Sequence, residues 1–304
     1  MPPASVKQRV VVPPGLVVVD KPAGLTSHDV VARVRRIMGT RKVGHAGTLD
    51  PMATGVLVLG IERATKLLGH LALDTKAYLA TIALGSATTT DDAQGEVVST
   101  APDGSVAAVA DEAIADGIRA LTGAIQQVPS AVSAVKVDGK RAYARVRAGE
   151  QVELAARPVE VSRFDVLATR RLDASIELDV MVECSSGTYV RALARDLGAG
   201  LGVGGHLAAL RRTRVGPFDL RVVTTLERLA DEPGLSLPLD AAVAAAFPRR
   251  DVGERAAAAL LRGQRLPAEG ITGTYGVFDP AGRAIALAVD EGEFTRSLVV
   301  LTPA

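Results

Sequence analysis

Cysteine, tryptophan and long apolar runs are scarce in this sequence. It has one cysteine and no tryptophan, and aromatic residues make up 3% of its 304 residues. The lone Cys184 excludes an internal disulfide framework and any metal site built on several thiolates. No uncharged apolar run reaches about 18 residues, so the sequence predicts no membrane span. The four histidines are scattered outside any H-E-x-x-H pattern, which argues against a zinc site.

Motifs of the common cofactor-dependent enzymes are also missing. The sequence contains no G-x-x-x-x-G-K-[ST] loop, no G-x-G-x-x-G fingerprint and no G-x-S-x-G elbow. We therefore expect neither a cofactor nor a metal. The first 12 residues hold Lys7 and Arg9 before a short valine run, without the apolar stretch or cleavage site of a signal peptide, so we expect a cytoplasmic protein.

The composition that remains is that of a folded protein. Hydrophobic residues make up 48% and charged residues 23%, and the net charge is +1. A core of Val, Leu, Ile and Ala can therefore form. A net charge near zero does not exclude a nucleic-acid partner, because local clusters of basic residues decide that binding.

Apolar periodicity predicts strands and helices without a regular β-α rhythm, which favours an α+β fold. Residues 1–15, rich in proline, are expected to form a disordered tail, and 16–245 one large domain. From about 246 the glycine spacing is typical of a small β-barrel. Expected strands are 16–19, 56–60, 78–84, 159–167 and 175–182. One helix is expected to begin at the N-cap Ser27 and to end at Gly39. The other expected helices are 62–73, 111–121, 188–198 and 205–214.

The segment 44–55, Gly-His-Ala-Gly-Thr-Leu-Asp-Pro-Met-Ala-Thr-Gly, is the most informative stretch of the chain. It places the carboxylate of Asp50 in a glycine-studded loop directly before Pro51. Small residues allow another backbone to approach closely, and the proline favours an extended conformation of Asp50. Taken alone, such a segment is also compatible with a structural turn held by an Asx hydrogen bond.

This segment closely resembles the G-H-x-G-x-L-D-P-x-A-T-G motif of the TruB family, the tRNA pseudouridine-55 synthases. Further segments resemble the family's motifs in the same order, and their ordered sum makes the resemblance specific. The resemblance implies a pseudouridine-synthase fold with a mixed, largely antiparallel sheet flanked by helices, and a PUA-like RNA-binding barrel over 246–304. The matching segments begin at Asp20-Lys21-Pro22, Ala64-Thr65-Lys66, Lys76-Ala77-Tyr78, Leu84-Gly85, Gln127, Cys184-Ser185 and Leu210-Arg211-Arg212.

The activity that the resemblance implies is isomerisation of a uridine in the T-loop of tRNA, without a cofactor. It assigns catalysis to Asp50, which a carboxylate suits because it can attack and then leave. Arg191 would pair with Asp50 and keep it ionised. Tyr78 would stack on the uracil and take part in proton removal, and Leu210 and Tyr189 would line the pocket. The alternative for such Tyr and Leu side chains is ordinary packing in the hydrophobic core.

The target base must leave its RNA stack before it can react, and His45 is the candidate to fill the vacated space. Lys21 and Lys66 are expected to support the catalytic loop. Three basic clusters would contact the RNA backbone without reading its sequence, although charge runs are usually only solvated faces. They are Arg33, Arg35, Arg36, Arg41 and Lys42; Lys136, Lys140, Arg141, Arg145 and Arg147; and Arg211, Arg212 and Arg214.

Two other functions remain open from the residues. A tRNA-folding chaperone could use the same basic surface, and it would not need Asp50. A nucleoside or glycoside hydrolase would need two carboxylates, and Asp92 is the nearest candidate for the second. For the synthase and for the chaperone the expected partner is tRNA through its T-arm, whereas the hydrolase would act on a nucleoside or sugar. We expect a monomer.

Overall fold

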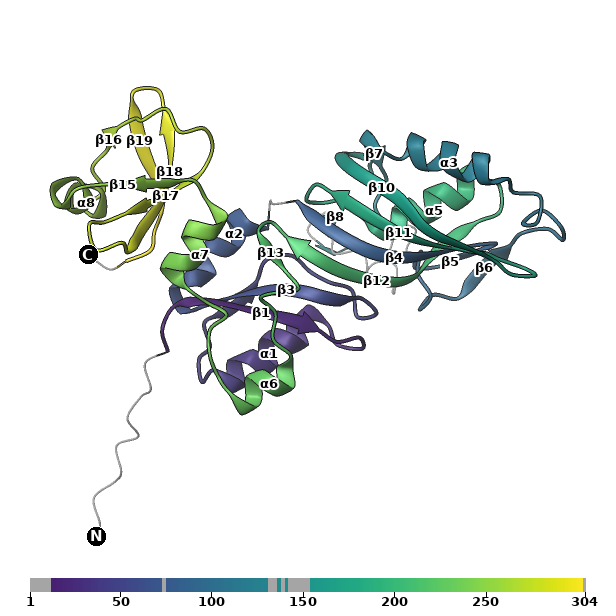
Figure 1. Cartoon of the computed structure of the whole chain (residues 1–304), viewed down its shortest axis with the longest axis horizontal. Coiled ribbons are helices and arrows are strands. Elements are labelled where there is room, and N and C mark those ends of the chain that lie inside the picture. Colours follow the sequence, from purple (N-terminus) through teal and green to yellow (C-terminus); the bar gives the residue numbers. More distant parts are fainter. Residues whose placement is uncertain (1–11, 73–74, 131–135, 138–139, 142–153, 303–304) are drawn as a thin grey trace, which may run out of the picture.

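The computed structural model describes residues 12–72, 75–130, 136–137, 140–141 and 154–302. The large domain is built on a ten-stranded sheet with the order β14-β1-β3-β12-β4-β11-β10-β7, to which β2 and β13 add at β3 and β12. Helices lie along this sheet, and a second, five-stranded sheet lies at one end of the molecule (Figure 1). The expected α+β fold with a mixed sheet is confirmed.

The large sheet is antiparallel except between β3 and β12. Its first strands are β1 (Gly15–Lys21), β2 (Val43–His45), β3 (Thr54–Ile61), β4 (Lys76–Leu84) and β7 (Gly123–Gln127). The later ones are β10 (Arg157–Arg171), β11 (Ile176–Cys184), β12 (Gly205–Val215), β13 (Phe218–Asp219) and β14 (Leu237–Pro238). Two short hairpins lie outside it, β5 (Ser86–Thr88) with β6 (Val97–Thr100), and β8 (Lys136–Val137) with β9 (Lys140–Arg141).

The helices of the large domain are short. They are α1 (Ser27–Ile37), the 3-10 helix η1 (Glu62–Leu67), α2 (Leu68–Leu71), α3 (Asp111–Ala120), α5 (Val190–Gly200), α6 (Leu226–Asp231) and α7 (Leu239–Ala246). In Figure 1, α1 and α6 lie together beside β1 and β3, whereas α3 and α5 lie at the β10–β11 end. None of the described helices has the length and hydropathy that crossing a membrane requires.

The first helix begins one residue earlier than expected. Thr26, not Ser27, is the N-cap: its hydroxyl accepts a hydrogen bond from the backbone N–H of Asp29, whose carboxylate accepts one from the backbone of Thr26. This reciprocal capping box releases the Ser27 side chain from capping. Ser27 is buried and faces the segment that carries Asp50.

The prediction of a helix over 205–214 is wrong, because this segment is the long strand β12. Leu207 and Leu210 are buried at a three-residue spacing that is typical of a helix. On β12 that spacing arises from a register shift between Leu207 and Ala209, and a second shift follows between Arg212 and Arg214. Each shift inserts an extra residue and so interrupts the two-residue alternation of a strand.

The C-terminal unit contains β15 (Arg249–Asp251), α8 (Glu254–Leu261), β16 (Leu266–Pro267), β17 (Tyr275–Phe278), β18 (Ala284–Glu291) and β19 (Phe294–Val300). Its strands follow the order β15-β17-β18-β19-β16, which forms a curled half-barrel. Residues 1–11 of the expected tail lie outside the described residues, and Gly15 already belongs to β1. Phe278, Leu287 and Leu301 pack in one apolar cluster with residues of β1 and β3.

Candidate active site

Asp50 lies on the loop between β2 and β3, near the middle of the large sheet. The loop folds back on β3, because the N–H of Ala46 donates to the carbonyl of Val58 at 2.9 Å. It then turns at Asp50, whose carbonyl accepts from the N–H of Ala53 at 3.1 Å. Gly47 has a φ of +96°, a conformation that L side chains rarely adopt. Gly47 is thus required by this turn.

Neighbouring elements hold the loop on both sides of Asp50. The hydroxyl of Ser27 on α1 donates to the carbonyl of Leu49 at 3.1 Å and accepts from its N–H at 2.8 Å. The buried ammonium of Lys21 donates to the carbonyls of Leu25 at 2.6 Å and Pro51 at 3.3 Å. Burial lowers the pKa of Lys21 to about 8. Lys21 is therefore buried against the loop and bonded to its main chain.

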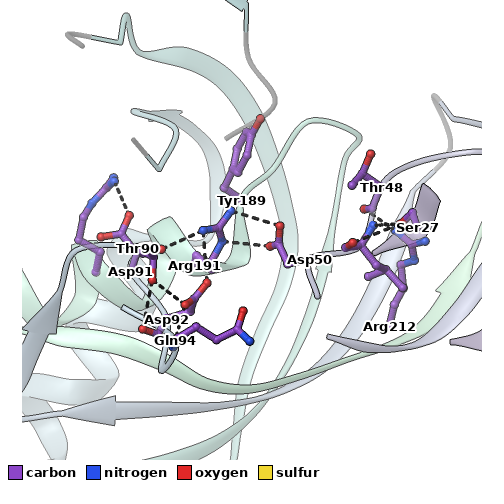
Figure 2. Close-up of polar contacts among 12 residues, drawn as sticks. Ser27, Thr48, Asp50, Thr90, Asp91, Asp92, Gln94, Tyr189, Arg191 and Arg212 are labelled. Carbon is purple, nitrogen blue, oxygen red and sulfur yellow. Dashed lines mark hydrogen bonds and ion pairs between the residues drawn. The ribbon is translucent and has the colours of Figure 1, made fainter. Parts of the chain in front are cut away.

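The carboxylate of Asp50 is paired with Arg191, which lies in the first turn of α5. The Nε of Arg191 is 3.0 Å from Oδ2 of Asp50, and its Nη2 is 3.3 Å from Oδ1 (Figure 2). The Arg191 side chain is 6% exposed and that of Asp50 35%. Burial raises the pKa of Asp50, and the charge of Arg191 partly offsets this shift. The structure thus brings the two residues together in the expected two-bond ion pair.

A second carboxylate lies on the opposite side of Arg191. The Nη1 of Arg191 is 3.3 Å from Oδ2 of Asp92 and donates to the carbonyl of Thr90 at 2.9 Å. Asp92 is 4% exposed, and its Oδ1 accepts from the Thr90 hydroxyl at 2.6 Å and from the N–H of Gln94 at 3.0 Å. Figure 2 shows Arg191 between the two carboxylates. Asp92 therefore fixes Arg191, which in turn orients Asp50.

A cavity of about 300 Å³ opens in front of this ion pair. Tyr78, which is 6% exposed, and Leu210, which is 9% exposed, contribute to its wall from β4 and β12. Burial raises the pKa of the Tyr78 hydroxyl. Tyr189, at the N-cap of α5, lines the same cavity and is held through its backbone by the side chain of Gln127. With Arg191 and Arg212, five predicted site residues thus line the cavity beside Asp50.

This arrangement combines an oriented carboxylate, a phenol hydroxyl and an apolar wall. Such a cavity can accept a flat base, place it next to a nucleophile and keep a proton acceptor nearby. The other described cavity of note, about 540 Å³ in volume, is lined mainly by apolar residues of β4, β10, β11 and β12 and shares Leu210 with the first. In the described ranges no group of three or more His, Cys, Asp or Glu could hold a metal ion.

His45 lies at the end of β2, five residues before Asp50, and does not line the cavity. Its ring is partly buried and meets that of His28 edge to face, with the centroids 5.5 Å apart. Burial lowers the pKa of His45, and its buried Nδ1 has no hydrogen-bond partner among the described residues. The exposed His28 completes a pair of aromatic rings beside the catalytic loop.

The basic residues of β12 are held by other groups of the protein, and Arg212 is buried. Arg212 is 1% exposed and donates to main-chain carbonyls, so it cannot reach a phosphate. Arg211 is bound by both carboxylate oxygens of Asp20, at 3.0 and 2.7 Å. Arg214 is 2.6 Å from a carboxylate oxygen of Glu183. The sequence could not reveal these pairs, because each partner lies on a distant strand or loop.

Lys66 contacts the C-terminal unit and not the catalytic loop. Its ammonium donates at 2.8 Å to the carbonyl of Val300, in the last strand of the C-terminal unit. The first basic cluster, by contrast, is exposed throughout. In the second cluster, Lys136 and the pair Lys140 and Arg141 lie in β8 and β9 with side chains outside the described part, and Arg145 and Arg147 lie outside the described residues.

Sequence reasoning missed the roles of Asp92, Ser27 and Gln127. Asp92 was considered only as the second carboxylate of a hydrolase, and Ser27 only as a helix cap. The available signals were the Thr-x-Thr-x-Asp and Gln-x-Pro patterns around Asp92 and Gln127. Neither pattern says which distant side chain it meets, and the contact with Arg191 spans 99 residues of sequence.

Models of known families match the chain between residues 35 and 302. Residues 35–190 match the N-terminal domain of TruB family pseudouridylate synthases. Residues 191–243 match the tRNA pseudouridylate synthase B C-terminal domain, and 247–302 match the C-terminal region of tRNA pseudouridine synthase II.

Similar curated proteins include two named tRNA pseudouridine synthase B. The one from Nocardia farcinica is 64% identical over 289 residues, covering 95% of this chain and 94% of that protein. The one from Rhodococcus jostii is 62% identical over 291 residues, with coverage of 95% and 94%.

Among solved structures, a chain of a Cbf5-Nop10-Gar1 complex is 27% identical, with a TM-score of 0.71, and the match covers 95% of this chain and 85% of that one. A chain of the archaeal box H/ACA sRNP Nop10-Cbf5 complex is 26% identical, with a TM-score of 0.69 and coverage of 95% and 86%.

Proposed function

Because the chain belongs to the TruB family of pseudouridylate synthases, we propose that it converts the uridine at position 55, in the T-loop of tRNA, to pseudouridine. The observation that carries this proposal is the cavity in which Arg191 holds the carboxylate of Asp50 opposite Tyr78 and Leu210. The relatives named tRNA pseudouridine synthase B support tRNA as the substrate.

The reaction rearranges one nucleotide and consumes nothing. The bond between C1′ and N1 breaks, the uracil turns within the cavity, and a bond between C1′ and C5 forms. C5 then loses its proton and N1 gains one, so atoms and electrons balance. No redox partner is needed, and the residues around the cavity are a carboxylate, a phenol and cationic groups, which suit proton and nucleophile chemistry.

We assign the cleavage step to Asp50. Attack on C1′, attack on the base and removal of the C2′ proton on the way to a glycal all require an ionised carboxylate. Burial works against ionisation, whereas the charges of Arg191 and Lys21 favour it. Arg191 is itself fixed by Asp92, so the carboxylate is oriented before substrate binds.

Tyr78 and Leu210 would sandwich the uracil, and the Tyr78 hydroxyl would accept or relay the C5 proton. Tyr189 contributes the opposite part of the wall. His45, outside the cavity, would fill the space that the everted base leaves in the RNA. The exposed cluster Arg33, Arg35, Arg36, Arg41 and Lys42 would hold the phosphate backbone, with Lys136 and Arg211 as further candidates, and these contacts would make binding salt-dependent.

The C-terminal residues 246–304 are proposed to extend the RNA-binding surface as a PUA-like unit, and residues 16–245 to form the catalytic domain. We further propose that the protein acts as a monomer in the cytoplasm, where its tRNA substrate is found. No observation favours the chaperone or the hydrolase as the main activity.

The test is the Asp50→Asn variant with purified tRNA carrying tritium at C5 of uridine. We expect tritium release to be lost while tRNA binding stays close to that of the unmodified protein. A minimal T-arm stem-loop should also be a substrate, and modification mapping should place the product in the T-loop.

Three outcomes would contradict the proposal. Unchanged turnover by Asp50→Asn would remove Asp50 from the mechanism. Free uracil in mass spectrometry would identify a hydrolase. Refolding of tRNA without any tritium release by the unmodified protein would identify a chaperone.

A further inference from the structure

Arg212 is the largest fully buried side chain in the described structure. It lies on β12, where the strand runs between β3 and β4, opposite Gly55 on one side and Tyr78 on the other. A guanidinium remains charged in proteins, so burying it requires nearly all of its donors to be satisfied. The groups that accept hydrogen bonds from Arg212 therefore indicate which part of the structure it holds in place.

Its partners are main-chain carbonyls of the catalytic loop and of β3. The Nε donates to the carbonyl of Val56 at 2.8 Å, Nη1 to that of Thr48 at 3.3 Å, and Nη2 to that of Gly47 at 3.2 Å. In Figure 2, Arg212 and Thr48 lie on the side of Asp50 away from Arg191. The rigid fork of one guanidinium thus fixes the two residues that precede Leu49 and Asp50.

The same guanidinium also acts on Tyr78. Arg212 lies opposite Tyr78 across β12 and β4. Burial raises the pKa of the Tyr78 hydroxyl, and the charge of Arg212 counteracts this shift. The other charged or titratable groups facing Tyr78 are Asp50 on the loop and Cys184 on β11, and both raise its pKa. Lys76 and Arg191 also line the cavity.

We infer that Arg212 is a positioning residue of the isomerisation, which sets the catalytic loop and the Tyr78 hydroxyl in one geometry and does not bind RNA. This inference rests on the proposed function and deepens it. Asp50 and Tyr78 come from different elements, and Arg212 joins the two. A displacement of about 1 Å at a reacting group costs on the order of 100-fold in rate.

The test is Arg212→Lys, which keeps a positive charge but replaces the fork with a single nitrogen. We expect kcat on a T-arm stem-loop to fall by about 100-fold while KM and the salt dependence of binding stay unchanged. The matched control is Arg170→Lys, since Arg170 is ion-paired at the far end of β10 with Glu177 and Asp179. That control should keep full activity.

A second variant, Arg212→Met, removes the charge as well. Because the charge of Arg212 lowers the pKa of Tyr78, the limb of the pH–rate profile that follows Tyr78 ionisation should move to higher pH. A purely structural role would lower the melting temperature and leave that limb in place. An increased KM with unchanged kcat, together with a weaker salt dependence, would overturn the inference in favour of a phosphate contact.

If neither variant folds, the unmodified protein bound to a T-arm decides the question. Arg212 still bonded to the carbonyls of Gly47 and Thr48 supports the inference, and Arg212 on a phosphate overturns it. The proposed function fails separately, if the unmodified protein forms no pseudouridine in the same assay.

Discussion

At the scale of single residues, two buried arginines organise the site in different ways. Arg191 pairs with carboxylates on two sides and so balances its charge within the site. Arg212 donates to three carbonyls and so fixes main-chain atoms. The first arrangement controls the ionisation of Asp50, and the second controls where Asp50 lies. Both are needed, because a carboxylate reacts only when it is ionised and correctly placed.

The ionisation of Asp50 predicts an acid limb in the activity. Burial raises the pKa of this carboxyl, and the protonated form cannot act as a nucleophile. The single-turnover rate should therefore fall as the pH is lowered through a pKa above the ordinary 3.8. Because the charge of Arg191 lowers this pKa, Arg191→Met should move the limb to higher pH. Quench-flow measurement of tritium release over a pH series checks this.

The control for that series is Arg228→Met, a change of the same kind at an exposed position in α6. Its limb should coincide with that of the unmodified protein. If the acid limb of Arg191→Met lay at the same pH as that of the unmodified protein, the ion pair would not control the pKa of Asp50.

The role of Asp92 can be separated from that of its neighbour. Asp92→Asn keeps the hydrogen bonds with Thr90 and Gln94 but removes one of the two anions that hold Arg191. We expect kcat to drop by about 10- to 100-fold with little change in KM, since Arg191 loses its fixed orientation. Single-turnover kinetics with a T-arm stem-loop measure this drop.

Asp91→Asn is the matched control. Asp91 is paired with Arg195, 3.2 Å away, and its positive φ of 57° is readily adopted by Asn. Equal losses in the two variants would mean that the loop as a whole matters, not the contact of Asp92 with Arg191.

At the scale of elements, the site depends on the parallel contact between β3 and β12. This contact places the end of the catalytic loop against Arg212. It requires Gly55, whose φ is +99° and whose Cβ would lie 2.1 Å from the carbonyl oxygen of Arg212. The last glycine of the G-H-x-G-x-L-D-P-x-A-T-G motif therefore allows β3 and β12 to pack closely, and it does not bind the substrate.

Gly55→Ala should destabilise the protein by about 3 kcal/mol or more, because backbone strain adds to the clash with β12. Chemical denaturation monitored by circular dichroism measures the free energy of unfolding. Gly69→Ala is the control, since a Cβ at Gly69 on α2 meets open space. A Gly55→Ala protein of unchanged stability would refute the close approach of the two strands.

At the scale of the whole molecule, the C-terminal half-barrel and the large domain share a core. Leu287, Phe278 and Leu301 pack with Leu16 and Val18 of β1 in one apolar cluster. The carboxylate of Asp240 on α7 also accepts from the N–H of Ala284, at 2.7 Å. A unit attached in this way cannot swing freely, so it presents a fixed surface beside the large domain.

Leu287→Ala should therefore lower the stability of both parts together. We expect a loss of about 2 to 5 kcal/mol for a fully buried leucine and a single unfolding transition. Calorimetry measures both quantities. Phe294→Ala, at an exposed position of the same small sheet, should leave stability nearly unchanged. Two separate transitions, with only one moved by Leu287→Ala, would show that the units fold independently.

The sequence by itself determined the fold class, the position of five strands of the large sheet and the motif around Asp50. These features depend on segments that are continuous in the sequence. The alternation of Tyr78, Ala80, Ile82 and Leu84 predicts a strand, and the resemblance of segment 44–55 to the family motif predicts the site. The ordered motifs also identified the family.

Only the tertiary structure decided the roles of Arg212, Asp92 and β12. A run of arginines looks the same in a sequence whether it meets water, a carboxylate or a carbonyl, and here the three arginines of β12 met partners 30 or more residues away. Leu207 and Leu210 looked helical because a bulge shifts the alternation of a strand. Charge satisfaction and register are set by contacts between distant segments, and no local pattern carries them.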